Sequence, residues 1–189
     1  MRLGSSAFIV QILRDHLFAG ERVLRERAAE FLSKTRSRAV VRKLARALSS
    51  PRDYVSTRAA WGLTLCKDDL AIDLLERALN GGNERIRSQA SWALGRIENP
   101  RAMKVLVSAL ESPRRAVYAQ AAAGLWRAAV NGYRSAQVER TLIGLLKRDK
   151  GQVALTLSHM LRNRTSPPRK RPATAVLTAF ERHGGSWIR

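Results

Sequence analysis

Tryptophan and arginine side chains recur along this chain, and both residue types are suited to non-covalent recognition. Trp61 and Trp92 lie 31 residues apart, and Trp126 follows in the next segment. An indole ring can anchor a protein partner in a pocket or stack on a nucleic-acid base. Arginine holds carboxylates and phosphates through paired hydrogen bonds. These residues indicate a binding surface. The arginines expected to steer a partner towards the indoles are Arg87, Arg96 and Arg127.

A second set of basic residues falls in the turns between the predicted helices. Neighbouring helices pack about 10 Å apart, so these turns would form a basic row along one edge. Each turn also precedes a helix start, where the helix dipole and free N–H groups favour anions. One interpretation is an edge that binds phosphates, and the other is a solvated edge of an arginine-rich protein. The residues are Arg52, Arg85, Arg114, Arg115, Lys147, Arg148 and Lys150.

A repeat of 31 residues positions these side chains. The segments that begin at Leu24, Val55, Ile86 and Val117 align without gaps. A second set of apolar segments falls between them and ends at positions 48, 79, 110 and 146, so the last step is longer and indicates an insertion near 131–135. Both sets have helical apolar spacing. A fixed period of this size predicts stacked two-helix units.

Less regular segments flank the repeats. Residues 1–19 predict an amphipathic helix that caps the first repeat, and 151–189 predict a degenerate last repeat with a helix at about 173–183 and a basic tail. We therefore expect one domain over 1–189, with regular repeats at 20–150. Three turn residues are candidate N-caps, because their side chains can accept a backbone hydrogen bond. They are Asp53, Asn83 and Ser112.

The charge of the chain favours an anionic partner. It has 35 basic and 15 acidic residues and a net charge of +20. Such a charge attracts polyanions over a long range, although the codon bias of a GC-rich genome would also enrich arginine. Four of the basic residues fall largely on one face of a predicted helix, where they form either a partner surface or a solvated face. They are Arg38, Arg42, Lys43 and Arg46.

The number of cysteines and the hydropathy of the chain indicate the cellular compartment. The single cysteine, Cys66, excludes an internal disulfide and predicts a small core residue near a helix end. No apolar run reaches the roughly 18 residues that a membrane span needs. We expect a cytoplasmic protein that does not contact membranes.

The repeat resembles the HEAT repeats, in particular the short HEAT-like repeats of the phycobilin-lyase type. The resemblance rests on a turn followed by Val/Ile-Arg-x-x-Ala-x-x-Ala-Leu-Gly, which Ile86-Arg87, Ala90 and Ala93-Leu94-Gly95 match best. It covers residues 20–150 and implies an all-α fold, an α-solenoid of about five two-helix repeats. In such arrays the helix after the turn lines the concave face. The resemblance thus implies that the three tryptophans lie in a groove, unless they fill space between repeats.

The HEAT-like proteins that this chain resembles include enzymes. None of the three histidines has the glutamate neighbour that binds iron in the HEAT-type hydroxylase, so we expect no metal and no cofactor. HEAT-like DNA glycosylases use an acid on a basic concave face. Here Glu30 is the only nearby candidate, because Asp68 and Asp69 are predicted to lie in a loop. We assign no catalytic residue and expect a protein that is not an enzyme.

Two functions of different classes follow. The first is a non-catalytic scaffold that binds a macromolecular partner, anionic and expected to be a protein, through the tryptophan groove and the basic turns. The alternative is a nucleic-acid-binding solenoid that contacts phosphates along the basic edge. A lyase-like or glycosylase-like subunit is a third interpretation. The oligomeric state stays open.

Overall fold

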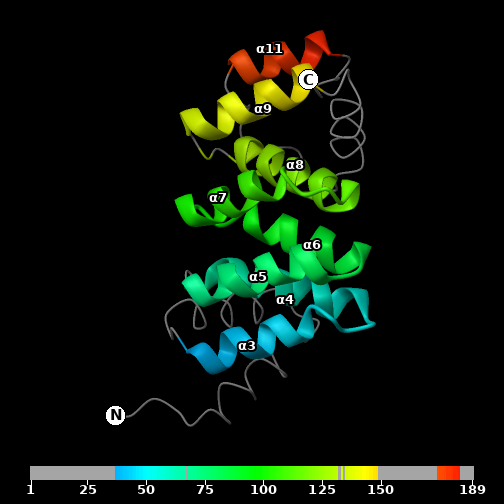
Figure 1. The fold of residues 1–189 in the computed structure, drawn as a ribbon. Coiled ribbons are helices and arrows are strands. Elements are labelled where there is room, and N and C mark those ends of the chain that lie inside the picture. The colour runs from blue at the N-terminus through cyan, green and yellow to red at the C-terminus, as the bar shows by residue number, and fades with distance from the viewer. Residues whose placement is uncertain (1–36, 67, 132, 134, 149–173, 184–189) are drawn as a thin grey trace, which may run out of the picture. The chain divides into compact units, whose positions relative to one another are not determined.

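The computed structural model describes residues 37–66, 68–131, 133, 135–148 and 174–183, and every element within these ranges is a helix (Figure 1). The chain divides into two compact units, Met1–Ala93 and Leu94–Arg189. The predicted capping helix at 1–19, the first repeat helix at Leu24 and the segment 151–173 lie outside the described residues. The single-domain organisation stays a prediction.

The described part of the first unit consists of helices joined by short turns. They are α3 (Arg38–Ala47), α4 (Asp53–Leu65), α5 (Asp69–Gly81) and α6 (Glu84–Leu94), of which only Leu94 belongs to the second unit. Helix α3 packs against both α4 and α5. Each helix covers the apolar segment predicted for it, which confirms that the 31-residue period corresponds to a pair of helices.

The second unit repeats this arrangement. Its described helices are α7 (Pro100–Ala109), α8 (Arg115–Val130), α9 (Ala136–Arg148) and α11 (Thr174–Arg182). Helix α7 packs against α8 and α9, and α9 packs against α8 and α11. Helix α8 has 16 residues where α6 has 11. The five extra residues of the predicted insertion therefore lengthen α8 rather than residues 131–135, because the loop after α8 is as long as the loop 95–99 after α6. Helix α11 confirms the predicted last helix.

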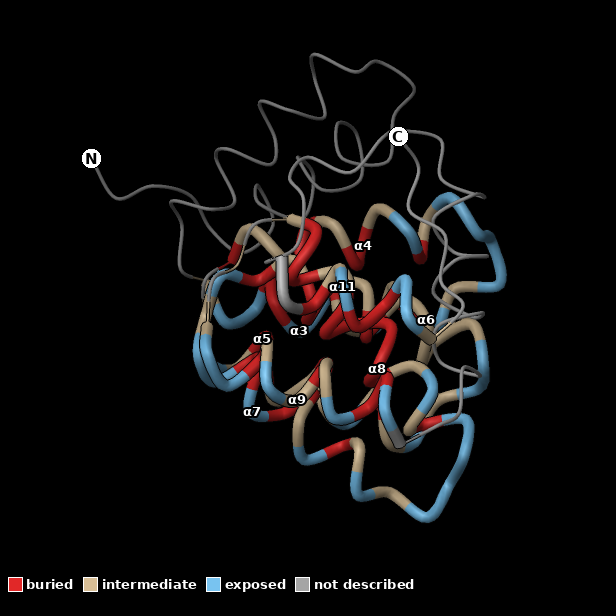
Figure 2. Tube along the Cα trace, turned by 90° about the horizontal axis from the view of Figure 1, so that it is seen from above, coloured by how far each residue is buried: buried red, intermediate tan, exposed pale blue. Residues whose placement is uncertain are grey.

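The second helix of each pair is amphipathic. In α7 the buried residues, among them Met103 and Leu106, alternate with exposed Arg101 and Lys104. Figure 2 shows α7 with buried positions along one side and exposed positions along the other. Burial of this apolar stripe, more than intrinsic helix propensity, stabilises a helix of only ten residues.

Side-chain caps fix the starts of three helices. Asn83 Oδ1 accepts a hydrogen bond of 3.0 Å from the backbone N–H three residues on, which confirms it as the cap of α6. Asp68 and Asn99 cap α5 and α7 through the N–H two residues on. Each such cap contributes about 1 kcal/mol. Asp69 is the first residue of α5, so the prediction of a loop there is wrong.

The predicted caps Asp53 and Ser112 are wrong. Arg52 and Arg114 occupy the N-cap positions of α4 and α8, without a side-chain cap bond. In each turn a serine hydroxyl accepts a 3.3 Å hydrogen bond from the arginine N–H, Ser50 from Arg52 and Ser112 from Arg114. The serine therefore orders the turn just before the helix. Asp53 is the first residue of α4, so its carboxylate can form an ion pair with a side chain of another helix.

Small residues allow close backbone approach in the second unit. Residues 121–126 of α8 are all buried, so this helix is enclosed around most of its circumference. At Gly95, a Cβ atom would overlap the carbonyl oxygen of Gly124 in α8. Glycine at position 95 is therefore a packing requirement of this contact.

We expect Gly95→Ala to lower the free energy of unfolding by about 1–3 kcal/mol, because the added methyl group forces the backbone of α8 away. Urea denaturation followed by circular dichroism measures the change. The control is Gly144→Ala in α9, where a Cβ would meet no atom within 4 Å. That substitution should raise stability by up to about 1 kcal/mol, since alanine favours the helix. Equal effects at the two positions would contradict the packing argument.

Candidate functional site

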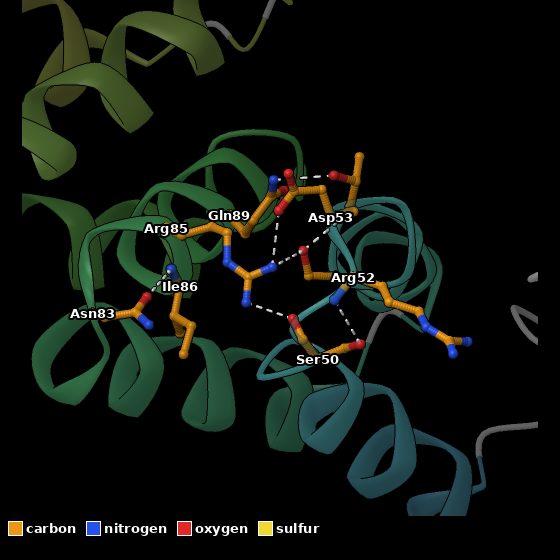
Figure 3. A network of polar contacts seen from close by, with 9 residues as sticks. Ser50, Arg52, Asp53, Asn83, Arg85, Ile86 and Gln89 are labelled. Carbon is orange, nitrogen blue, oxygen red and sulfur yellow. Dashed lines mark hydrogen bonds and ion pairs between the residues drawn. The ribbon is translucent and has the colours of Figure 1, made fainter.

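Arg85 connects the first turn of α6 to the start of α4 (Figure 3). Its Nη1 donates to Asp53 Oδ1 at 3.0 Å and to Ser56 Oγ at 3.4 Å. Its Nη2 donates to the carbonyl oxygen of Ser50 in the preceding turn. One guanidinium thus joins a carboxylate, a hydroxyl and a turn carbonyl that lie up to 35 residues away in the sequence.

A second contact continues this network one turn along the same helices. Gln89 Nε2 donates to Thr57 Oγ1 at 3.1 Å (Figure 3). Together the two contacts form a polar seam between α4 and α6. Both terminal nitrogens of Arg85 donate within this seam. Arg85 therefore holds α6 against α4. Its role as a phosphate ligand stays a prediction.

The other basic turn residues differ in where they lie and in how far the structure describes them. Arg52 is exposed, and in Figure 3 its side chain points away from the seam. Arg114 and Arg115 are exposed at the start of α8, and Lys147 is exposed in the last turn of α9. Arg148 ends α9, and Lys150 lies outside the described residues. These residues belong to two units, so a continuous basic row stays a prediction.

The three tryptophans do not share one environment. Trp61 in α4 and Trp92 in α6 are half-buried. Trp126 in α8 is only 2% exposed and packs on Phe180 of α11, with ring centroids 4.5 Å apart. Such a pair contributes about 0.5–1.5 kcal/mol beyond the area it buries. Trp126 is therefore a core residue of the second unit, and its prediction as a groove residue is corrected.

The arginines predicted to steer a partner are half-buried. Arg87 donates through Nη1 to the carbonyl oxygen of Gly82, the C-cap of α5. Arg96 and Arg127 have the same intermediate exposure and also make interactions. These three guanidinium groups thus contribute to the fold as well as to the charge.

An exposed aromatic residue was missed in the sequence. Tyr54 is 49% exposed in the first turn of α4, and the Arg58 guanidinium lies over its ring, 5.4 Å from the centroid. The spacing of four residues was the signal, since such residues are neighbours on a helix. The contact is a cation–π interaction that orders Tyr54 on the surface of the first unit.

Cys66 is the buried residue that the sequence predicts. It is 4% exposed at the C-cap of α4, and its thiol donates to the carbonyl oxygen of Gly62 at 3.3 Å. Burial, followed by the negative charge of Asp68, raises the pKa of the Cys66 thiol to about 12. Cys66 is therefore a neutral core thiol rather than a nucleophile.

The described residues contain neither a candidate metal site nor a candidate membrane span. Within the described ranges, no three His, Cys, Asp or Glu side chains are grouped so that they could hold a metal ion. Among the helices of the same part of the chain, none combines the length and hydropathy of a membrane span.

Residues 41–126 match the HEAT-repeat family. With the helix pairs described above, this match confirms the α-solenoid fold class. The N-terminal capping helix in that prediction lies outside the described residues. No curated protein matches the chain.

Several solved structures are similar to the chain at low identity. Human deoxyhypusine hydroxylase in complex with glycerol is 22% identical, with a TM-score of 0.42, over 64% of this chain and 43% of that one. An engineered protein is 18% identical, with a TM-score of 0.37, over 96% and 95%. The complex of CpcE and CpcF of phycocyanin lyase from Nostoc sp. is 15% identical, with a TM-score of 0.35, over 100% and 91%. The chain thus spans less than half of the hydroxylase, and these matches carry no information on activity.

We expect Arg85→Ala to lower the free energy of unfolding by about 1–2 kcal/mol, because a part-buried carbonyl, a hydroxyl and a carboxylate lose a shared donor. Asp53→Ala should cost only a few tenths of a kcal/mol, since the Asp53 side chain is 87% exposed and its ion pair is screened by water. Arg52→Ala is the matched control and should change stability by less than about 0.5 kcal/mol. Urea denaturation distinguishes the three variants, and an equal cost for Arg85→Ala and Arg52→Ala would show that the seam is not stabilising.

We expect Cys66 to resist a thiol reagent in the folded protein. The rise of its pKa from 9.0 to about 12 lowers the thiolate fraction at pH 8 on the order of a thousandfold. Because the folded pKa is the higher one, the thiol favours the folded state below pH 9, and this contribution is lost as the pH rises from 9 towards 12. The labelling rates of the folded and the unfolded protein are measured, without and with urea, from the absorbance that a disulfide reagent develops when it reacts with the thiol. Labelling of the folded protein as fast as that of the unfolded chain would contradict the assignment.

Proposed function

Since the chain is a HEAT-like repeat protein, we propose that it is a non-catalytic scaffold that binds an anionic macromolecular partner. The observation that carries the proposal is the distribution of its exposed basic residues. Arg52, Arg114, Arg115 and Lys147 are exposed at helix ends, where they do not add to the core. The charge is thus presented at the surface of both units.

Electrostatics support an anionic partner. A net charge of +20 on 189 residues produces a strongly positive field, which raises the rate of encounter with polyanions. Arg52 and Arg114 lie at the N-caps of α4 and α8, where the partial positive charge of the helix adds to that of the side chain. An acidic or phosphorylated surface would gain from both.

The chemistry of these side chains supports a binding role. Guanidinium groups stay protonated at neutral pH and cannot exchange a proton with a substrate, so they hold anions rather than act as acids or bases. The half-buried Trp61 and Trp92 could add apolar contact area in the first unit. Burial of Trp126 leaves the proposed groove with two indoles, so charge carries more of the recognition than the sequence predicted.

We expect the wild-type protein to bind heparin and polyglutamate, with an affinity that falls as salt rises. Replacement of Arg52, Arg114, Arg115 and Lys147 by glutamine should weaken binding about tenfold at 150 mM salt, since four exposed charges at roughly 0.35 kcal/mol each sum to that factor. Isothermal titration calorimetry measures both affinities.

A control variant removes the same charge elsewhere. Arg77, Lys104, Arg140 and Arg182 are exposed on α5, α7, α9 and α11 and are replaced by glutamine together. Equal weakening in the two variants would show that only net charge matters, and the turn residues would then lose their role. A wild-type dissociation constant above about 100 µM for every polyanion at 150 mM salt would overturn the proposed function.

A further inference from the structure

The outer surface of α3 is entirely basic among its charged residues. Arg38, Arg42, Lys43 and Arg46 are all exposed, and Arg38–Ala47 contains no acidic residue. Within the described part of the chain, none of the four side chains forms an ion pair or a hydrogen bond with another side chain. We call these four residues the α3 face.

The spacing of the α3 face gives it a regular geometry. At 100° and 1.5 Å per residue, Arg38, Arg42 and Arg46 follow one another in steps of about 6 Å along the helix and form a row about 12 Å long. Lys43 widens the row to an arc of roughly 140°. Like charges four residues apart destabilise a helix slightly. The α3 face therefore costs stability, and no hydrogen bond or ion pair with another described side chain compensates for this cost.

The buried side of α3 limits the choice of partner. Val40, Val41, Leu44 and Leu48 are all buried in the first unit. A helix that lies in a membrane interface needs its apolar side for the lipid. In α3 that side is occupied by α4 and α5, so insertion into a bilayer is not possible without unfolding the unit.

The composition of the exposed side argues against a protein partner. Besides the four basic residues, the exposed positions are Ala39 and Ser49. Protein interfaces are anchored by aromatic or other large apolar side chains in their core, and lysine is depleted there. A surface with charge and no apolar anchor suits a polyanion whose charges are regularly spaced.

We propose that the α3 face binds the phosphate backbone of duplex nucleic acid without reading its sequence. This inference rests on the proposed function, because it names the class of the anionic partner. A duplex carries one negative charge per about 1.7 Å of its axis, so a row of 12 Å lies against roughly seven phosphates. Each arginine of the row holds a phosphate through two parallel hydrogen bonds.

The absence of aromatic side chains from the α3 face favours duplex over single-stranded nucleic acid. Proteins that bind single strands stack the bases on aromatic residues. Phosphate contacts alone fix position and carry no sequence information. Binding at the α3 face therefore depends on salt and not on base sequence.

Fluorescence anisotropy with a labelled 20-base-pair random duplex DNA, from 50 to 300 mM salt, tests the proposal. The α3 variant carries Arg38→Gln, Arg42→Gln, Lys43→Gln and Arg46→Gln, and glutamine keeps the helix propensity. Each lost phosphate contact lowers the slope of log K against log salt by about 0.9, so the α3 variant should lose a slope of about 3–4. The control variant at Arg77, Lys104, Arg140 and Arg182 should lose less than about 1.

Two further sets of variants separate the effects of charge, hydrogen-bond geometry and folding. Arg38→Lys, Arg42→Lys and Arg46→Lys together keep the charge, so the salt slope should stay while the affinity falls, because lysine cannot form the paired bonds. Single glutamine substitutions at Arg42 and Arg46 should each lower the slope by about 0.9. If the fourfold variant does not fold by circular dichroism, these single variants decide the question.

The outcomes distinguish this proposal from the proposed function. Equal slope loss in the α3 and control variants, or an unchanged slope in the α3 variant with a loss in the variant at Arg52, Arg114, Arg115 and Lys147, overturns the α3 face and leaves the proposed function standing. Tighter binding of single-stranded DNA or polyglutamate than of duplex overturns the partner class alone. If the wild-type protein binds no polyanion at 150 mM salt, both proposals fail.

Discussion

Close packing of helices that carry small side chains constrains the rest of this structure. In the second unit the backbone of Gly95 touches that of Gly124, and residues 121–126 of α8 are all buried. At this spacing, alanine and glycine fill the interior, and a large side chain fits only where a further helix makes room for it. Trp126 shows the consequence, because its ring lies against Phe180 of α11, which covers it. The aromatic pair exists because α8 is enclosed.

The same constraint divides the arginines into two groups. Where helices approach closely, a long guanidinium can reach across to the neighbouring turn, as Arg85 does from α6 to Ser50 and Asp53. Where a helix end faces water, the guanidinium can point away from the neighbouring helices, as that of Arg52 points away from the seam (Figure 3). The net charge of +20 is therefore not one uniform property of the molecule. Part of it stabilises contacts between repeats, and part is available to a partner.

Helix positions could be predicted from the sequence because the period of 31 residues and the helical apolar spacing are local and repeated. Asn83 was predicted as a cap because the bond it accepts spans three residues. The role of Arg85 could not be read from its turn, since its acceptor Asp53 lies 32 residues away, although one repeat plus one residue is a spacing that would have indicated it. The burial of Trp126 depends on Phe180, which lies beyond the regular repeats. The local apolar spacing was thus enough to predict the helices. Which site residues stay exposed depends on contacts between residues far apart in the sequence, which that spacing does not contain.

The outer helices show how a repeat array can present charge at its surface while its apolar residues form the core. In α7 and α3 the apolar stripe is fully used by the core, so the outer side is free to vary without cost to packing. In α5 that outer side mixes Asp69 and Arg77, which is what a solvated surface requires. In α3 every charge has the same sign. Repulsion among these four like charges opposes folding, and their exposed side chains bury no apolar area in return. The cluster of basic residues on α3 is therefore better explained by a bound polyanion than by a contribution to stability.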